Sequence, residues 1–235
     1  MRRRHPLVPF SLVAALFLPS CAGGQDQAAP TDSAPPAAGI DAPAATPDWQ
    51  VRADASHDAD AGFALATSEA GTRITTSRFS GILYRPDQAA TGTYEVLATI
   101  DVLPGSRRSE GYGIFVGGSG LDGEGQRYTY FLLRDDGKYL VKTRDGGGTS
   151  TVVDWTASSA IRTLPSSAAE GDRASNTIVV QVTPSAITLL INGERVVRRP
   201  RGDLALEGIA GLRVNHGLEL QVQSFDVAAP SAPAE

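Results

Sequence analysis

Residues 128–143 read YTYFLLRDDGKYLVKT, and two runs of alternating side chains meet here at Asp136-Gly137. In the first run, Phe131 and Leu133 fall on one side of an extended chain, while Tyr128 and Tyr130 fall on the other. Because side chains of a β-strand point alternately to its two faces, this pattern predicts a half-buried strand. The Asp-Gly pair predicts a tight turn. The stretch is therefore predicted to form a β-hairpin.

The same pattern continues on both sides of this hairpin. Residues 94–102 alternate apolar and polar side chains, and Asn192-Gly193 separates two further apolar runs. Additional short strands are expected at residues 62–67, 73–76, 81–84, 111–117, 150–155, 177–183, 208–214 and 218–227. Many short strands separated by Gly and Asp turns, without an internal repeat, favour two packed antiparallel sheets. We expect one all-β sandwich over residues 48–227.

The N-terminus has the character of an export signal. Arg2, Arg3 and Arg4 precede an apolar run, residues 7–18, that is short for a membrane span. Small residues then precede Cys21, the only cysteine in the chain, and this order resembles a bacterial lipobox. The resemblance implies a leader over residues 1–20 and an acylated Cys21 that anchors the mature protein. The alternative is ordinary cleavage nearby, which would leave an exported protein without a lipid.

A second compositional change follows the cysteine. Residues 21–47 are rich in Ala and Pro and contain no aromatic side chain, so they predict a disordered linker, and residues 228–235 predict a similar tail. Ala22 after the cysteine resembles the signal for delivery to the outer membrane of a two-membrane envelope, on its periplasmic or surface side. Three of the 21 basic residues, and none of the 26 acidic ones, lie in the leader, so the mature chain is acidic. That charge argues against nucleic acid as a partner.

The order of motifs along the body is similar to that of a known superfamily. The matching stretches are residues 112–115, 128–139, 153–155, 176–180, 191–193 and 208–212. They resemble the concanavalin A-like lectin/glucanase superfamily, and most closely the laminin-G-like jelly rolls of bacterial envelope proteins, among them the 3-keto-disaccharide hydrolase domain. Residues 120–128 also resemble a segment found in a group of bacterial lipoproteins. The resemblance implies a jelly-roll sandwich, and it leaves function open because this fold hosts lectins, glycosidases and adhesion modules.

Two tyrosines are the first candidates for a ligand site. Tyr128 and Tyr130 share the face opposite Phe131, and aromatic rings on a sheet face offer a stacking surface to sugars. Arg134 lies further along the same face, and His216, in a turn, is a further polar candidate. The alternative is that both tyrosines are ordinary cross-strand packing partners or are covered by a loop.

A glycine-rich loop at residues 117–126 carries Asp122 and Glu124. Glycines allow the close backbone approach that sugar and cation sites need, but the spacing fits no EF-hand. We therefore expect no cofactor, with calcium at this loop as the alternative. A second acidic stretch, containing Asp54, His57, Asp58 and Asp60, is a weaker metal candidate.

No catalytic pattern accompanies these residues. Glycosidases use paired carboxylates on one face, and the nearest pairs, Glu95 with Asp101 and Glu219 with Asp226, lack that spacing. We expect a non-catalytic, lectin-like domain that binds a glycan or another surface macromolecule, such as an envelope protein. The alternatives are a carbohydrate-active hydrolase and a structural interaction module. We also expect Trp155, two residues after Val153, to lie in the core between the sheets.

The lipobox generates the first testable prediction. Cys21→Ala removes the only residue that acylation could use, so the protein should move from the membrane to the soluble fraction. Sucrose-gradient fractionation measures this distribution. Retention of the variant in membranes would contradict lipid anchoring.

Overall fold

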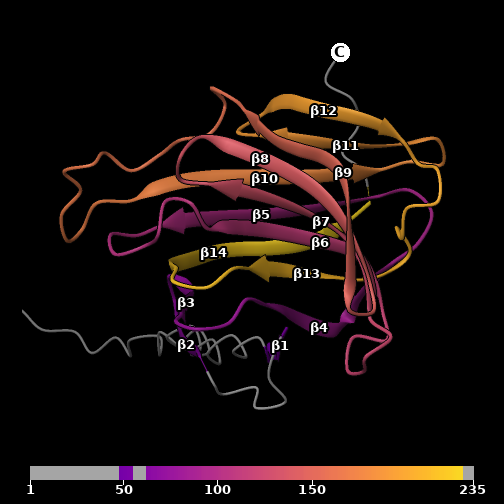
Figure 1. Cartoon of the computed structure of the whole chain (residues 1–235), viewed down its shortest axis with the longest axis horizontal. Coiled ribbons are helices and arrows are strands. Elements are labelled where there is room, and N and C mark those ends of the chain that lie inside the picture. The colour runs from indigo at the N-terminus through magenta and orange to yellow at the C-terminus, as the bar shows by residue number, and fades with distance from the viewer. Residues whose placement is uncertain (1–47, 55–61, 230–235) are drawn as a thin grey trace, which may run out of the picture. The chain divides into compact units, whose positions relative to one another are not determined.

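The computed structural model of this 235-residue chain describes residues 48–54 and 62–229. These residues form fourteen β-strands and no helix (Figure 1). Within the same ranges, nothing has the length and apolar character that a membrane-crossing helix requires. The predicted leader, linker and lipidated Cys21 lie outside the described residues.

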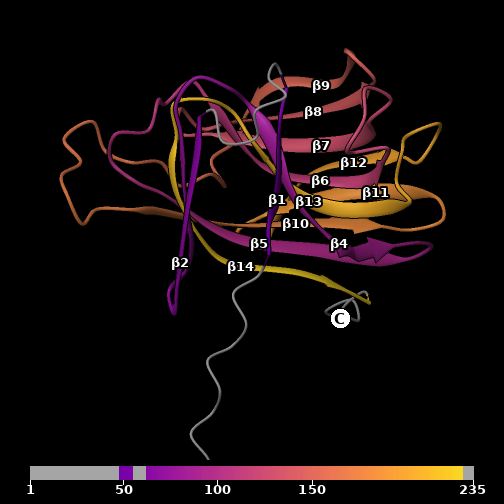
Figure 2. The ribbon, with the colours of Figure 1, turned by 90° about the horizontal axis from the view of Figure 1, so that it is seen from below.

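The strands form two seven-stranded antiparallel sheets, which we name sheet A and sheet B. Sheet A has the order β1-β4-β13-β6-β7-β8-β9, with bounds Gln50–Ala53, Gly81–Ala90, Gly208–Val214, Gly111–Ser119, Arg127–Arg134, Lys138–Asp145 and Gly148–Ala157. Sheet B has the order β12-β11-β10-β5-β14-β3-β2, with bounds Glu194–Pro200, Ala186–Ile191, Ala174–Val182, Tyr94–Val102, Glu219–Ala228, Gly71–Thr76 and Phe63–Ser68. In Figure 2, β7 to β9 lie above β10, β5 and β14, so the two sheets are stacked layers. The predicted all-β, two-sheet sandwich is confirmed.

Both predicted hairpins are present. Strands β7 and β8 pair from Arg134↔Lys138 onward, and Gly137 closes the turn with φ of 81°. Strands β11 and β12 meet at Asn192-Gly193, where φ is 50° and 85°. Asn and Gly tolerate positive φ better than other residues, so this pair sets the register of the hairpin.

The main core lies between the sheets and follows the predicted alternation. On β5, Val96, Ala98, Ile100 and Val102 are buried, and they pack with alternate residues of β10 and with Phe131 of sheet A. Burying one such side chain stabilises the fold by about 1.5–3 kcal/mol relative to leaving it in water. The core therefore fixes the inward face of both sheets.

Sheet A carries a second apolar layer on its other face. Every buried member of this layer comes from sheet A or the loop after β6, and we call the set the outer layer: Ile82, Tyr84, Phe115, Leu121, Tyr128, Tyr130, Leu132 and Leu140. Ile209 and Trp155 pack against it. The middle strands β6 and β7 of sheet A are thus buried on both faces, whereas antiparallel sheets commonly have one face in water.

Trp155 corrects one expectation from the sequence. Val153 packs on the core between the sheets, but Trp155 is only partly buried and packs on the outer layer. The reason is a β-bulge between β8 and β9. Val153 pairs with Val141 and Thr156 pairs with Tyr139, so β9 advances by three residues where β8 advances by two. A bulge inserts one residue and reverses the alternation after it. The ring is therefore turned away from sheet B.

The two layers should differ in their contribution to stability. Phe131 is fully buried between the sheets, so Phe131→Ala should lower the free energy of unfolding by about 3–5 kcal/mol. Trp155→Ala removes a larger ring but leaves the core intact, so its effect should be less than half as large. Urea unfolding measures both, and equal losses would contradict this division of the core.

Candidate functional site

A buried ion-pair cluster lies above the outer layer. Arg213 of β13 donates two hydrogen bonds to the carboxylate of Asp54, one of them from Nη1 to Oδ1 at 2.8 Å. Arg144 of β8 approaches the same carboxylate, with Nη1 3.4 Å from Oδ1. The guanidinium of Arg213 also lies over the Tyr130 ring at 5.6 Å. The cluster therefore joins the end of β1 to β13 and β8 across the face of sheet A.

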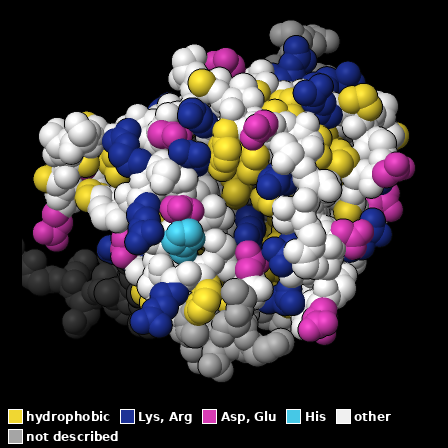
Figure 3. Space-filling view, in the orientation of Figure 1, with side chains coloured by type: hydrophobic (Ala, Val, Ile, Leu, Met, Phe, Trp, Pro, Cys, Tyr) yellow, Lys and Arg dark blue, Asp and Glu magenta, His cyan; other side chains and the backbone are white. Residues whose placement is uncertain are grey.

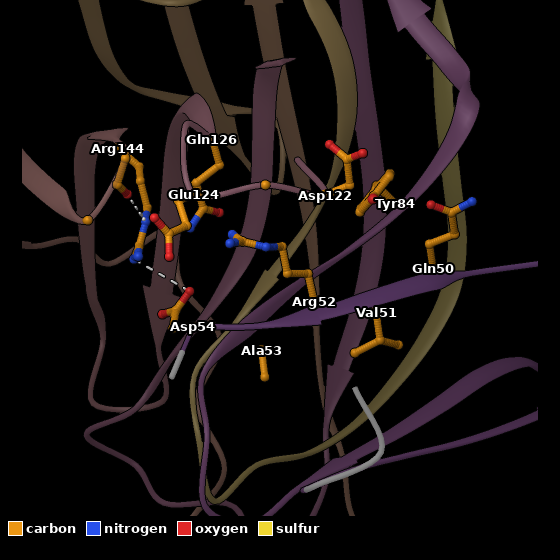
Figure 4. A pocket seen from close by; sticks show the side chains of 13 residues that line it. Gln50, Val51, Arg52, Ala53, Asp54, Tyr84, Asp122, Glu124, Gln126 and Arg144 are labelled. Atoms are coloured by element: carbon orange, nitrogen blue, oxygen red, sulfur yellow. Dashed lines mark hydrogen bonds and ion pairs between the residues drawn. The ribbon is translucent and has the colours of Figure 1, made fainter. Parts of the chain in front are cut away.

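A pocket of about 620 Å³ opens beside this cluster (Figure 4). One wall is β1 with the residue after it, the opposite wall is the loop between β6 and β7, and Tyr84 of β4 contributes an aromatic ring. Its lining consists of Gln50, Val51, Arg52, Ala53, Asp54, Tyr84, Asp122, Gly123, Glu124, Gln126, Arg144, Gly146 and Gly147. In Figure 4, Arg52 extends from β1 toward the side that carries Gln126 and Glu124, and Asp122 lies beside Tyr84.

Backbone hydrogen bonds hold the loop wall in place. Gly123 N–H donates to the carbonyl of Gly120 at 3.1 Å, and Gly146 N–H donates to the carbonyl of Gln126 at 2.8 Å. Arg144 Nε donates to the carbonyl of Gly146 at 3.0 Å. The β6–β7 loop, the β8–β9 turn and the ion-pair cluster are thereby linked, which gives the pocket a preformed wall.

Several buried polar atoms at this site have no hydrogen-bond partner among the described residues. Gln126 Oε1 and Arg52 Nη1 are two of them, and both residues line the pocket. The hydroxyl of Tyr128, in the outer layer, and Nε of Arg213, in the ion-pair cluster, are two more. Buried polar groups in native proteins are nearly always satisfied, by protein, water or a ligand. Two of the four residues that carry such atoms line the pocket, and the other two lie beside it.

Tyr128 and Tyr130 lie on the face predicted for them, but they are not open to a ligand. Tyr128 is 0% exposed and Tyr130 6% exposed. Tyr128 contacts Phe115 at 5.1 Å and Tyr130 at 5.7 Å between ring centroids. Burial raises the pKa of both phenols. The expected open stacking surface is therefore corrected, because protein side chains already cover these rings.

The other predicted residues are divided between the pocket and more distant positions. Asp122 and Glu124 line the pocket, as the loop composition suggested. Arg134 binds Asp136 at 2.6 Å and lies over the Trp155 ring at 4.7 Å, without lining the pocket.

His216, the only histidine among the described residues and shown in cyan in Figure 3, pairs with Glu110 at 3.4 Å. It follows β13 at the end where Val214 pairs with Tyr112, whereas the pocket loop leaves β6 at its other end. It does not line the pocket. The structure therefore does not bring His216 together with Asp122 and Glu124.

Three of the carboxylates considered for catalysis or metal binding, Asp101, Glu219 and Asp54, have structural partners. Asp101 is fully buried and accepts from Gln223 Nε2 at 2.7 and 2.8 Å. Glu219 accepts from Thr75 at 2.9 Å and pairs with Arg73. Asp54 belongs to the ion-pair cluster, and the other three residues of its acidic stretch are outside the described ranges. Within those ranges, no three or more acidic, His or Cys side chains gather as a metal site requires.

Sequence reasoning did not single out Arg52, Gln126 and Arg144, which line the pocket, or Arg213, which adjoins it. The three arginines are single charged residues in strand-like stretches, and Gln126 ends the glycine-rich loop whose carboxylates were considered instead. Arg213 alone gave a signal, because it is a charged residue within the apolar run of residues 208–214. A charge inside such a run requires a buried partner.

No protein-family model matches the chain, and no curated protein sequence matches it. Solved structures do match. The carbohydrate-binding module CBM66 from Bacillus subtilis aligns with a TM-score of 0.56 at 10% identity, covering 77% of this chain and 95% of the module. The exoplasmic/lumenal domain of VIP36, in a form bound to Ca2+ and Man3GlcNAc, aligns with a TM-score of 0.51 at 11% identity, covering 80% and 86%.

The potassium-bound carbohydrate recognition domain of Emp46p aligns with a TM-score of 0.50 at 12% identity, covering 78% of this chain and 89% of that domain. Identities this low establish shared architecture. The described domain has the concanavalin A-like jelly-roll fold that the sequence motifs implied.

The ion-pair cluster generates a stability prediction. Asp54→Ala leaves the charge of Arg213 buried without its partner, which should lower the free energy of unfolding by about 3–5 kcal/mol. Asp145→Ala is a matched control, because Asp145 pairs with Arg127 at an exposed position, and it should cost less than about 1 kcal/mol. Similar unfolding midpoints for the two variants in urea would contradict a structural role for the cluster.

Proposed function

We propose that this chain is a lipid-anchored protein of the bacterial cell envelope whose jelly-roll domain binds a glycan without cleaving it. The observation that carries the proposal is the pocket between β1 and the β6–β7 loop. Its volume of about 620 Å³ lies within the usual range for small-molecule sites. Its side chains include hydrogen-bond donors, hydrogen-bond acceptors and one aromatic ring, a combination that suits a polyhydroxylated ligand.

The rest of the outer face of sheet A is filled by protein side chains, which supports binding at the pocket. Protein side chains fill the outer layer, and Arg213 of the ion-pair cluster lies over the Tyr130 ring. Figure 3 shows this face of the molecule, where apolar side chains appear between basic and acidic ones in a hollow. A ligand would therefore contact the pocket walls rather than Tyr128 and Tyr130.

The anchoring part of the proposal depends on the sequence. Acylation at Cys21 would hold the domain at a membrane through residues 21–47, and Ala22 favours the outer membrane. A linker of that length would let the domain reach glycans or proteins near the membrane surface. The structures that share this fold include a carbohydrate-binding module and a carbohydrate recognition domain, and that likeness supports a glycan as the partner.

Glycan-array binding tests the proposal with the full chain in a detergent that lacks a sugar headgroup. The wild-type protein should retain at least one glycan, and Arg52→Ala should weaken that binding about tenfold or more, because Arg52 lies in the pocket wall. Arg198→Ala is the control, since Arg198 lies on β12 of sheet B and should leave binding unchanged.

Retention of no glycan would contradict the proposal and favour a protein partner. Release of reducing sugar from a bound glycan would contradict its non-catalytic part.

A further inference from the structure

The edge strand β12 of sheet B carries a row of basic side chains. Arg195, Arg198 and Arg199 are exposed, and we call these three residues the arginine edge. Within the described ranges, none of the three side chains has an ion pair or a hydrogen bond. Other exposed arginines, such as Arg73 beside Glu219, have a carboxylate partner. The arginine edge therefore presents three charges on one strand that are free to meet an anionic group.

Protection of the sheet edge does not account for all three arginines. Charged residues on an edge strand do prevent pairing with a strand of another molecule. However, β2, the other edge of sheet B, and β9, an edge of sheet A, contain neither Lys nor Arg. On β12 itself, Pro200 and a register shift at Leu189/Leu190 already disfavour such pairing. The arginine edge thus exceeds what this fold uses to protect its other edges, which favours a binding role.

The arginines are arranged to meet a flat surface. Arg199 pairs with Ile187, whose side chain lies in the core, so Arg198 beside it points to the opposite face of sheet B. The charges therefore lie on both sides of the strand. The pairing with β11 holds the strand in place, and the hydroxyl of Tyr139 from sheet A donates to the carbonyl of Val196 at 3.0 Å. A fixed row of charges along an edge, outside the pocket, suits a planar array of anions better than a single small ligand.

The arginine edge and the pocket lie at opposite edges of the sandwich. In Figure 1, β12 lies at the top and β1, which forms one wall of the pocket, lies at the bottom. Basic side chains gather at the same upper end in Figure 3. Seven strands spaced by about 4.8 Å make sheet B about 30 Å wide. Residues 21–47 can span up to about 90 Å when extended, so a chain anchored at Cys21 can bring β12 to the membrane.

We propose that the arginine edge docks on anionic lipid headgroups and turns the pocket away from the membrane. The inference rests on the lipid anchor of the proposed function and adds the orientation of the domain. The described residues carry nearly as many basic as acidic side chains, so the domain as a whole offers little repulsion. Each arginine near an anionic surface raises the affinity about fivefold, so three give about a hundredfold. That gain is small for a free protein, but a tether keeps the domain at a high local concentration beside the membrane.

The lipidated full chain, incorporated into vesicles, tests the proposal. Vesicles of phosphatidylcholine are compared with vesicles in which phosphatidylglycerol makes up about a third of the lipid, and both contain a dansyl-labelled lipid. Energy transfer from the two tryptophans of the chain to dansyl measures how close the domain lies to the bilayer. The transfer should be about twofold or more greater with the anionic vesicles, and about 0.5 M NaCl should remove the difference.

Three variants locate the effect. Arg195→Ala, Arg198→Ala and Arg199→Ala, made together, should abolish the increase in transfer, whereas lysines at the same three positions should retain most of it. The matched control removes the same charge at three exposed arginines outside β12: Arg78→Ala, Arg107→Ala and Arg162→Ala. This control should transfer as the wild-type chain does. The melting temperature of each variant separates loss of docking from loss of folding.

Equal transfer in neutral and anionic vesicles by a wild-type chain that floats with both would overturn the inference and leave the anchor intact. An equal loss in the matched control would also overturn it, because the effect would then follow net charge rather than the arginine edge. Binding to polygalacturonate without docking on anionic vesicles would assign the arginine edge to a polysaccharide instead. A chain that fails to float with neutral vesicles would contradict the lipid anchor, and the inference with it.

Discussion

Sheet A has apolar side chains on both of its faces, and its second face has no second sheet to cover it. Tyr128, Phe115 and Leu132 would expose a large apolar surface if nothing lay above them. Surfaces of that kind are costly in water, so the chain must cover them with its own side chains. Trp155 from β9 and the guanidinium of Arg213 both serve this purpose.

The outer layer is covered in part by an ion-pair cluster because one of the covering side chains, Arg213, is charged. A guanidinium that is 6% exposed needs a carboxylate to offset its desolvation, and Asp54 at the end of β1 supplies one in bidentate geometry. That contact fixes the end of β1, the edge strand of sheet A. Arg52 on the same strand is thereby placed in the pocket wall. The pocket is thus a consequence of how the outer layer is covered.

This arrangement differs from the open aromatic surface that the tyrosine spacing suggested. The aromatic residues of the outer layer lie beneath the pocket, and polar side chains of β1 and the β6–β7 loop line it. Specificity at such a site depends on which buried donors and acceptors a ligand satisfies, because leaving them unpaired is expensive.

The sequence by itself determined the fold class, both hairpins and the inward faces of β5 and β7, because alternation and turn residues are local properties. It also drew attention to Asp122 and Glu124, which line the pocket, since a glycine-rich loop with carboxylates is visible in a short window. It misplaced Trp155, because a single inserted residue in β9 reverses the face and leaves no mark in the local pattern. Only the tertiary structure joined Asp54 to Arg213 and brought Arg52 and Gln126 to the same pocket, because these residues are far apart in the chain. Such pairings depend on how the sheet curves and which strand forms its edge, and both are decided by packing of the whole domain.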